Sequence, residues 1–365
     1  MEHLAIDLGS RKSQICVRDS SGNIVQEGRI DTTRIGGELG GRAPCRVILE
    51  TCAEAFHIAD LARQAGHDVR VVPSSLARSL GVGARGVKSD QRDARAISEV
   101  STRIELRSVY VPSVEARKQS ALISSRRNLV AARTMHINHC RGWLRTQLVT
   151  LPRGSRSTFA KRVRKLAPPS HIEAVLICIE QATTQIAELD KEIVRLARSN
   201  EICRRLMTVP GVGPITALRF VAAVGDVSRF DSSHALQSYF GLVPGEHSSG
   251  ERSRRTSLTK AGNSHVRWLL VQAAWSAWRT RPEDPMSLWA TRVAVRRGKQ
   301  IAAVAVARKI AGVLFALWKY GTHYDPKLTA KPAEHDASAE LKAVIQANDA
   351  TEVAEIDRFT EEGSN

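Results

Sequence analysis

The chain has 365 residues, 42% of them hydrophobic, which is enough for two domains with cores of their own and connecting helices. It has no uninterrupted apolar run of about 18 residues, no basic leader before an apolar core and no Cys-x-x-Cys pair among its six cysteines. We therefore expect no membrane span, no secretory signal and no disulfide framework, and we place the protein in the cytoplasm. The net charge of +17 indicates a polyanionic partner, most often nucleic acid, although a basic surface that serves only solubility fits the same number.

The first part of the chain alternates strand patterns with one helical pattern. Residues 3–30 contain three short alternating segments, HLAIDLG, QICVRD and NIVQEGRI, which predict three strands joined by two hairpins. An apolar strand (RVILE, 46–50), a helix (AEAFHIADLARQAG, 53–66) and a further strand (VRVVP) follow. This order predicts an α/β domain with a mixed sheet over residues 1–110.

Long helices dominate the predicted middle region, residues 111–205. Residues 113–148 read as one basic helix. Residues 172–196 then repeat apolar side chains with spacings of three and four. So narrow a stripe favours a helical hairpin or an oligomerising coiled coil, and a helix packed on the protein's own core is the alternative.

The last predicted domain, residues 206–328, is mostly helical. The tail that follows, residues 329–365, is predicted to be acidic and poorly ordered. Within it, residues 331–365 carry nine acidic and three basic side chains, a net charge of −6. Residues 1–330 therefore carry +23, so the positive charge lies in the part of the chain that is predicted to fold.

Four carboxylates occupy positions that the predicted fold would bring together: Asp7, Glu50, Asp90 and Asp93. The first two lie on predicted strands, and the last two are three residues apart at a predicted helix start, on one face of that helix. Clustered carboxylates repel one another unless a cation is present, so the set predicts a divalent metal site for phosphodiester cleavage. For Asp90 and Asp93 alone, an exposed helix start favoured by the helix dipole is the alternative.

A glycine turn precedes the next helix in TVPGVGPITALRFVAAVGD, residues 208–226. This segment is similar to a helix-hairpin-helix element, in which glycines let backbone N–H groups approach a DNA phosphate. Gly211 and Gly213 are therefore candidate nucleic-acid contacts. An ordinary tight turn between two helices fits the same residues.

Ser248 and Ser249 lie in a predicted glycine-flanked loop within residues 239–270. The basic residues that follow them closely are Arg252, Arg254, Arg255 and Lys260. Guanidinium groups can stabilise the charge that develops when a serine attacks phosphate. A flexible basic loop that touches DNA without chemistry is the alternative, and composition alone favours it.

With these segments assembled, the chain resembles the DEDD-type insertion-sequence transposases, relatives of the pilin-gene invertases. The resemblance covers nearly all of residues 1–328. It rests on six segments in order: IDLGSRKSQICV, VILET, KSDQRDAR, VPGVGPITA, GLVPGEHSSG and TKAGNSHVRWLL. The ordered set is far more specific than any one segment.

The resemblance implies an RNase H-like (RuvC-like) fold for the first domain, with a quartet that binds Mg²⁺, two ions per site, for which Mn²⁺ could substitute. That quartet corresponds to Asp7, Glu50, Asp90 and Asp93. It also implies that a serine of the second domain attacks DNA and forms a covalent phosphoserine link. Ser249, directly before Gly250, fits this role best, with Ser248 as the alternative register.

The resemblance further implies DNA as substrate and a structured non-coding RNA that pairs with donor and target DNA. Cutting two strands at each of two sites requires several active centres, so we expect a homo-oligomer, a dimer or tetramer, associated with the nucleoid. One departure lies after the acidic strand, where Glu50 is followed by Thr-Cys-Ala and many relatives have Ala-Thr-Gly. The local turn is therefore expected to differ.

Three alternatives to a transposase remain open. The first is a RuvC-like nuclease that uses the quartet with water as nucleophile, although it would have no need of residues 206–324. The second is an actin-like sugar kinase, whose first phosphate loop resembles residues 6–25, but the second phosphate loop and the adenosine motif are missing from the sequence. The third is a decayed, non-catalytic DNA-binding protein, against which the four intact carboxylates argue.

Overall fold

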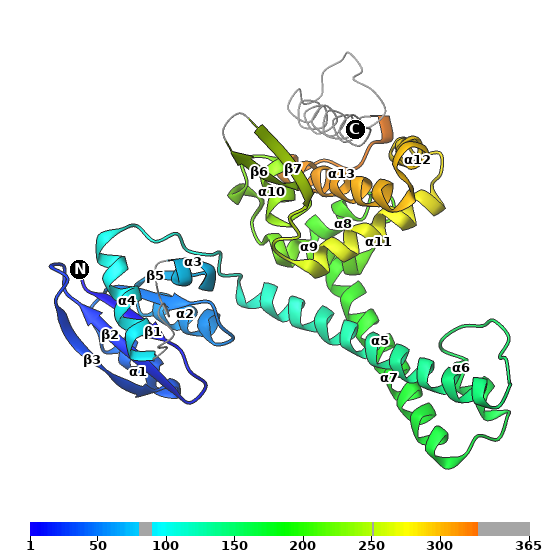
Figure 1. Cartoon of the computed structure of the whole chain (residues 1–365), viewed down its shortest axis with the longest axis horizontal. Helices are drawn as coiled ribbons and strands as arrows, with labels where there is room; N and C mark the ends of the chain where they lie inside the picture. Colours follow the sequence, from blue (N-terminus) through cyan, green and yellow to red (C-terminus); the bar gives the residue numbers. More distant parts are fainter. Residues whose placement is uncertain (80–89, 250–251, 328–365) are drawn as a thin grey trace. The chain divides into compact units, whose positions relative to one another are not determined.

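The computed structural model describes residues 1–79, 90–249 and 252–327, with only the backbone described for residues 77–79, 247–249 and 252–255 (Figure 1). The chain divides into two compact units, the first from Met1 to Pro112 and the second beginning at Ser113. The predicted acidic tail lies outside the described residues.

The first unit is built on a five-stranded sheet in the order β3-β2-β1-β4-β5. Its strands are β1 (His3–Asp7), β2 (Lys12–Arg18), β3 (Ile24–Asp31), β4 (Arg46–Glu50) and β5 (Asp68–Val72). The first three pair antiparallel as two hairpins, whereas β4 pairs parallel with both β1 and β5. This mixed sheet confirms the α/β class predicted for the region.

Helices cover both faces of this sheet (Figure 1). They are α1 (Ile35–Gly40), α2 (Ala55–Gln64), α3 (Ser74–Ser79) and α4 (Asp90–Arg103), with a short 3-10 helix at Thr32–Arg34. Leu4 and Ile6 of β1 join the core beneath α1 and α2, whereas Ala5 joins a smaller core with Ile97 of α4. Because successive strand residues point to opposite faces, α4 lies on the face opposite α1 and α2.

The second unit begins with a helical arm made of α5 (Val114–Thr146), α6 (Phe159–Arg164) and α7 (Ser170–Ser199). Helix α7 packs along α5, and Arg126 forms an ion pair with Asp190 while Arg133 lies 3.5 Å from the Thr183 hydroxyl. These pairs show that the two helices run antiparallel.

The predicted apolar stripe is the side of α7 that meets α5. Of its predicted members, Ile172, Ile179, Ala182, Ile186 and Ile193 are buried, and Val175, Leu189 and Leu196 are partly buried. Two further residues of α7, Leu176 and Ala197, are buried as well. The stripe therefore packs within the chain, as the helical-hairpin alternative predicts. An oligomerising coiled coil stays a prediction.

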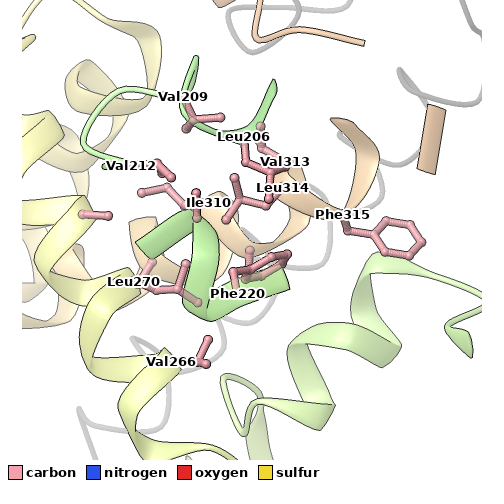
Figure 2. Close-up of a cluster of buried hydrophobic side chains, with 14 of the residues drawn as sticks. Leu206, Val209, Val212, Phe220, Val266, Leu270, Ile310, Val313, Leu314 and Phe315 are labelled. Carbon is pink, nitrogen blue, oxygen red and sulfur yellow. The ribbon is translucent and has the colours of Figure 1, made fainter. Parts of the chain in front are cut away.

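The remainder of the second unit is mostly helical, as predicted. Its helices are α8 (Glu201–Leu206), α9 (Pro214–Val224), α10 (Ser233–Tyr239), α11 (Ser264–Thr280), α12 (Pro285–Arg297) and α13 (Lys299–Tyr320), with a 3-10 helix at Val227–Arg229 and a hairpin of β6 (Pro244–Ser249) and β7 (Arg252–Leu258). Figure 2 shows their common core, where Phe220 of α9, Leu270 of α11 and Leu314 of α13 are each fully buried.

Helix α13 is long and apolar enough to cross a membrane, but 78% of its apolar window is buried inside the protein. Buried core helices of proteins that do not cross a membrane can be equally long and apolar. Arg308, in the middle of α13, is buried and donates from Nε to the side-chain oxygen of Gln237 at 3.0 Å. Burial in the core of the second unit thus accounts for the composition of α13.

A buried imidazole lies in the first turn of α11, next to α9, which also packs against α5. His265 is 6% exposed, and its Nδ1 atom has no hydrogen-bond partner in the described part of the chain. Burial lowers the pKa of His265 to about 4, helped by the positive charges of Arg127, Arg219 and Arg126. The folded protein therefore holds this imidazole neutral.

We expect acid to destabilise the second unit through His265. The imidazole takes up a proton near its ordinary pKa of 6.5 when unfolded but only near 4 when folded, so stability falls as the pH falls through this window. Urea titrations at pH 7 and pH 4.5 measure how far the unfolding free energy drops between the two pH values. This drop should be roughly 2 kcal/mol smaller in His265→Gln than in the wild type. The exposed His171→Gln is the matched control and should behave as the wild type. An acid response in His265→Gln equal to that of the wild type would contradict this assignment.

Candidate active site and nucleic-acid interface

Two of the predicted carboxylates end neighbouring strands. Ile6 of β1 pairs with Leu49 of β4 in parallel register, and the next residues, Asp7 and Glu50, are the last of their strands. Parallel strands end at the same edge of a sheet, so these two carboxylates lie side by side there. Both are partly buried.

The same two side chains share one face of the sheet. Ala5 and Ile48, which precede them by two positions, belong to the small core that includes Ile97 of α4. Side chains in a strand repeat every two residues, so Asp7 and Glu50 project toward the face that α4 covers.

Helix α4 brings the other two carboxylates to that edge. His3, at the start of β1, lies 2.8 Å from the Ser101 hydroxyl near the end of α4, so the helix runs opposite to β1. Its first turn, which contains Asp90 and Asp93, is therefore at the end where β1 stops. Asp93 is 5% exposed and belongs to the side of α4 that packs on the sheet, whereas Asp90 is exposed.

Ion pairs fix the first turns of α4 against the outer strand β3. Arg95 donates twice to the Glu27 carboxylate, both bonds at 2.6 Å, and Gln91 donates to it at 3.0 Å. The Arg95 hydrogen bonds keep the pKa of Glu27 below its ordinary value. Arg29 lies 3.3 Å from the Asp90 carboxylate. These contacts orient α4 so that Asp93 faces the sheet.

The donor chemistry of the quartet fits a divalent cation. All four groups are carboxylates, and carboxylate oxygens are ligands that Mg²⁺ and Mn²⁺ prefer. As placed, no three His, Cys, Asp or Glu side chains within the described ranges lie close enough to hold a metal ion. Metal binding by the quartet therefore stays a prediction, supported by the shared face and edge of its members.

The structure corrects the setting predicted for the candidate serines. Ser248 and Ser249 lie at the end of strand β6, not in a loop, and β6 pairs antiparallel with β7. Ser249 is paired with Arg252, and Ser248 with Ser253. Residues 250–251, between the two strands in the sequence, lie outside the described residues. The candidate nucleophile and the first candidate arginine are thus register partners at the last described pair of the two strands.

The other basic candidates follow along β7 and beyond it. Arg254 is paired with His247, and Arg255 with Glu246. Lys260 comes two residues after β7 and is exposed, with a φ of 53°. The hairpin and its exit therefore carry the basic residues in one short stretch, which is suited to contact with a polyanion.

The two candidate glycines have different surroundings. Gly211 has a φ of +79°, and a Cβ there would lie 2.1 Å from the carbonyl oxygen of Ala273 in α11. Close packing against α11 therefore requires this glycine, and contact of its backbone with a phosphate stays a prediction. Gly213 is the N-cap of α9, and a Cβ there would meet nothing within 4 Å. Only Gly213 leaves the start of α9 open in the way predicted.

Two features were not identified from the sequence. Glu27 and Arg95 are 68 positions apart, so no local spacing reveals their contact. His265 and its neighbouring arginines come from three helices, and the only signal was that His265 falls within the segment TKAGNSHVRWLL. Both features depend on long-range packing.

Comparison with known proteins identifies two family regions. Residues 4–148 match the transposase family DEDD_Tnp_IS110, and residues 203–287 match the family described as "Transposase IS116/IS110/IS902 family". The transposase for insertion sequence element IS1111A of Coxiella burnetii is 30% identical over 325 residues, which cover 86% of this chain and 88% of the relative. A probable family 20 transposase of Pseudomonas aeruginosa is 29% identical over 338 residues, 89% of this chain and 99% of the relative.

The chain thus combines a mixed-sheet domain that carries carboxylates at one edge with a helical unit, and both matched families are transposases, a class of DNA-processing enzyme. The chain belongs to the IS110/IS116 family of transposases. Its activity is therefore the DNA cleavage and rejoining of transposition, and its first domain is of the DEDD type, which generally depends on divalent metal and suggests an RNase H-like fold.

The two glycines provide a matched test of the α8–α9 turn. Gly211→Ala should lower the unfolding free energy by about 3 kcal/mol or more, because it forces a positive φ and a clash with the α11 backbone. Gly213→Ala should change it by less than about 1 kcal/mol, since the site is open and only an N-cap glycine is lost. Urea unfolding of both variants checks this. Equal losses would show that the turn does not pack on α11 as described.

Proposed function

We propose that this transposase cuts and rejoins the strands of a mobile element with a metal-bound acidic quartet and a serine nucleophile, under the direction of a structured non-coding RNA. The observation that carries the proposal is the position of Asp7, Glu50 and Asp93. They come from two strand ends and one helix, and they share one edge and one face of the sheet. Carboxylates that share one edge and one face are expected where a bound metal ion would draw them together, and this arrangement has no evident role in packing.

In this proposal the quartet holds two Mg²⁺ ions, for which Mn²⁺ would substitute. Bound there, the ions would polarise the scissile phosphate and stabilise the leaving oxygen. Asp93 supplies a carboxylate with a fixed position, because it is buried and because Arg95, on the same helix, is bonded to Glu27 of β3. Asp90 is exposed beside Arg29 and would exchange that cation for the metal.

Ser249 is the proposed nucleophile, with Ser248 as the register alternative. Its Oγ would attack phosphorus, forming one P–O bond while the bond to the leaving deoxyribose oxygen breaks. The serine proton passes to a neighbouring base, and the leaving oxygen takes up a proton. The number of phosphate ester bonds is unchanged, so rejoining needs no ATP. Arg252, Arg254 or Arg255, all on the partner strand, would hold the phosphate.

The basic charge supports nucleic acid as the partner of the second unit above all. Residues 1–330 carry +23, but residues 1–112 contribute only +2 of it, with 16 basic and 14 acidic side chains. So high a positive charge on residues 113–330 suits contact with both DNA and a guide RNA. Work on chromosomal DNA implies a cytoplasmic, nucleoid-associated location. The metal-only nuclease is the second candidate, and the presence of the hairpin with its arginines favours the serine mechanism over it.

The proposal is tested by trapping a covalent protein–DNA adduct with the full chain, the RNA of its element, junction DNA and Mg²⁺. Ser249→Ala should still bind DNA, since one hydroxyl is lost, but should form at least about 100-fold less adduct. Asp93→Asn should lose adduct to a similar extent because it deletes a proposed metal ligand. Denaturing gels of radiolabelled DNA measure both.

Matched controls separate chemistry from folding. Ser253→Ala changes the same group on the partner strand, and Asp60→Asn changes a carboxylate on α2, beneath the opposite face of the sheet; both should form normal adduct. Normal adduct in Ser249→Ala but not in Ser248→Ala would move the nucleophile by one residue. Normal recombination in both serine variants would refute the serine mechanism in favour of the metal-only nuclease. Adduct without RNA would refute RNA guidance.

A homo-oligomer, a dimer or tetramer, is part of the proposal, because several strands must be cut together. The buried stripe of α7 is already covered by α5, so an interface on the arm must use exposed residues such as Met135 and Ile177. The double variant Met135→Asp/Ile177→Asp should lower the mass measured by light scattering to that of one 40.0 kDa chain. An unchanged mass would exclude an interface that depends on these two residues. A wild type that is monomeric both alone and on DNA would refute the oligomer.

A further inference from the structure

Two arginines and one histidine from three packed helices form an electrostatically linked group in the second unit, outside the serine hairpin. We define the cationic cluster as Arg127 of α5, Arg219 of α9 and His265 of α11. Helix α9 packs against both α5 and α11, and the charges of Arg127 and Arg219 both lower the pKa of His265. Burial lowers the pKa of Arg219, and the positive charge of Arg127 lowers it further. The positive charges of Arg127 and Arg219 therefore act on an imidazole that the fold keeps neutral.

Within the described ranges this cluster has no counter-charge. Neither Arg127 nor Arg219 forms an ion pair there, whereas the nearby Arg126 is paired with Asp190. Two buried polar atoms, Nε of Arg219 and Nδ1 of His265, have no hydrogen-bond partner in that part of the chain. Buried polar atoms without partners cost stability, so their persistence points to an anion that completes them, and the exposed Arg127 adds positive charge nearby.

The start of α11 adds to this positive field. The helix has 17 residues, and its N-cap Asn263 accepts hydrogen bonds from the backbone N–H groups of His265 and Val266, both at 3.1 Å. The helix dipole places partial positive charge at this end. His265 is 94% removed from solvent in the first turn, so an unpartnered ring nitrogen stands at the end of a helix that favours anions.

An aromatic side chain adjoins the cluster. Trp268 is 54% exposed, and its ring centroid lies 6.0 Å from that of His265 at an interplanar angle of 36°. An exposed indole beside a phosphate-sized positive site is the combination that single-stranded nucleic acids bind, because unpaired bases stack on aromatic rings. A free anion or an acidic peptide has no base that would stack on the indole ring.

We propose that the cationic cluster binds a backbone phosphate of nucleic acid and that Trp268 stacks on an adjacent unpaired base. The site rests on the proposed nucleic-acid function of this unit but is separate from the serine hairpin. A phosphodiester is common to DNA and RNA, so both strand types share the chemistry that the site recognises. Because β7 ends at Leu258 and α11 begins at Ser264, a strand bound here would lie close along the chain to the hairpin.

The charge is tested by fluorescence anisotropy with the full chain and a labelled 12-nucleotide single-stranded DNA, its RNA equivalent and a duplex. The double variant Arg127→Gln/Arg219→Gln should bind the single strand about tenfold more weakly. Its slope of log affinity against log salt should fall by about 0.7 per lost phosphate contact. Arg195→Gln, an exposed arginine on α7, is the matched control and should change affinity less than about twofold. Equal behaviour of the double variant and this control would overturn the proposal.

The base-stacking half has its own variants. Trp268→Leu should weaken single-strand binding by about fivefold or more but leave duplex binding unchanged, and Trp268→Phe should restore most of it. A comparison of the affinities for the DNA and the RNA single strand shows which of the two the site prefers. Equal losses on single strand and duplex would refute stacking on an unpaired base.

Stability separates binding from a structural role. Arg219→Gln removes a partly buried, unpaired cation, so the free protein should melt at the same temperature as the wild type or higher. A lower melting temperature with parallel loss of affinity would make Arg219 a structural residue and overturn the proposal. If the Ser249 adduct fails to form while cluster variants still lose binding, the site stands and the nucleophile is wrong. If the adduct forms and cluster variants bind normally, this site alone is refuted.

Discussion

Strands β1 and β4 pair in parallel, and the placement of the acidic residues in the first unit depends on that pairing. It brings two strand ends to one edge, and the two-residue repeat then selects the face on which Asp7 and Glu50 project. A shift of one residue in the register of either strand would move its carboxylate to the face of α1 and α2. The apolar residues of both faces oppose such a shift, because Leu4 and Ala5 belong to different cores. The hydrophobic cores thus position the polar site.

Helix α4 depends on the same sheet for its orientation. Its inner side is held by Ile97 in the small core and by Ser98, which accepts a hydrogen bond from Arg18 at 3.1 Å. Its outer side is held by the Arg95–Glu27 pair. With both sides fixed, the helix has little freedom to rotate, and Asp93 stays buried against the sheet. A carboxylate in that position is costly unless a cation or a donor meets it, which is why it is informative about function.

Local pattern in the sequence was sufficient for the strands, the long helices and the strand-end position of Glu50, because alternation and helical spacing are local properties. It failed where one segment approaches another. The serines were placed in a loop because Ser-Ser-Gly reads as one, whereas pairing with β7 extends the strand through Ser249. Local pattern did not show that packing requires Gly211, because Ala273 of α11, which leaves no room for a Cβ there, lies 62 positions later. The stripe of α7 likewise could not reveal that its partner is α5 of the same chain.

Each unit buries polar side chains at its candidate site. In the first unit Asp93 is 5% exposed near the sheet edge that Asp7 and Glu50 share, and in the second unit Nε of Arg219 and Nδ1 of His265 are buried without a hydrogen-bond partner in the described part of the chain. Apolar side chains of similar size would pack there without the cost of burying a polar group. Under the proposals made above, a nucleic acid bound with Mg²⁺ would supply phosphate to the second unit and divalent cation to the first. Binding would then stabilise both sites, and the free energy released would favour the assembled complex over the free enzyme.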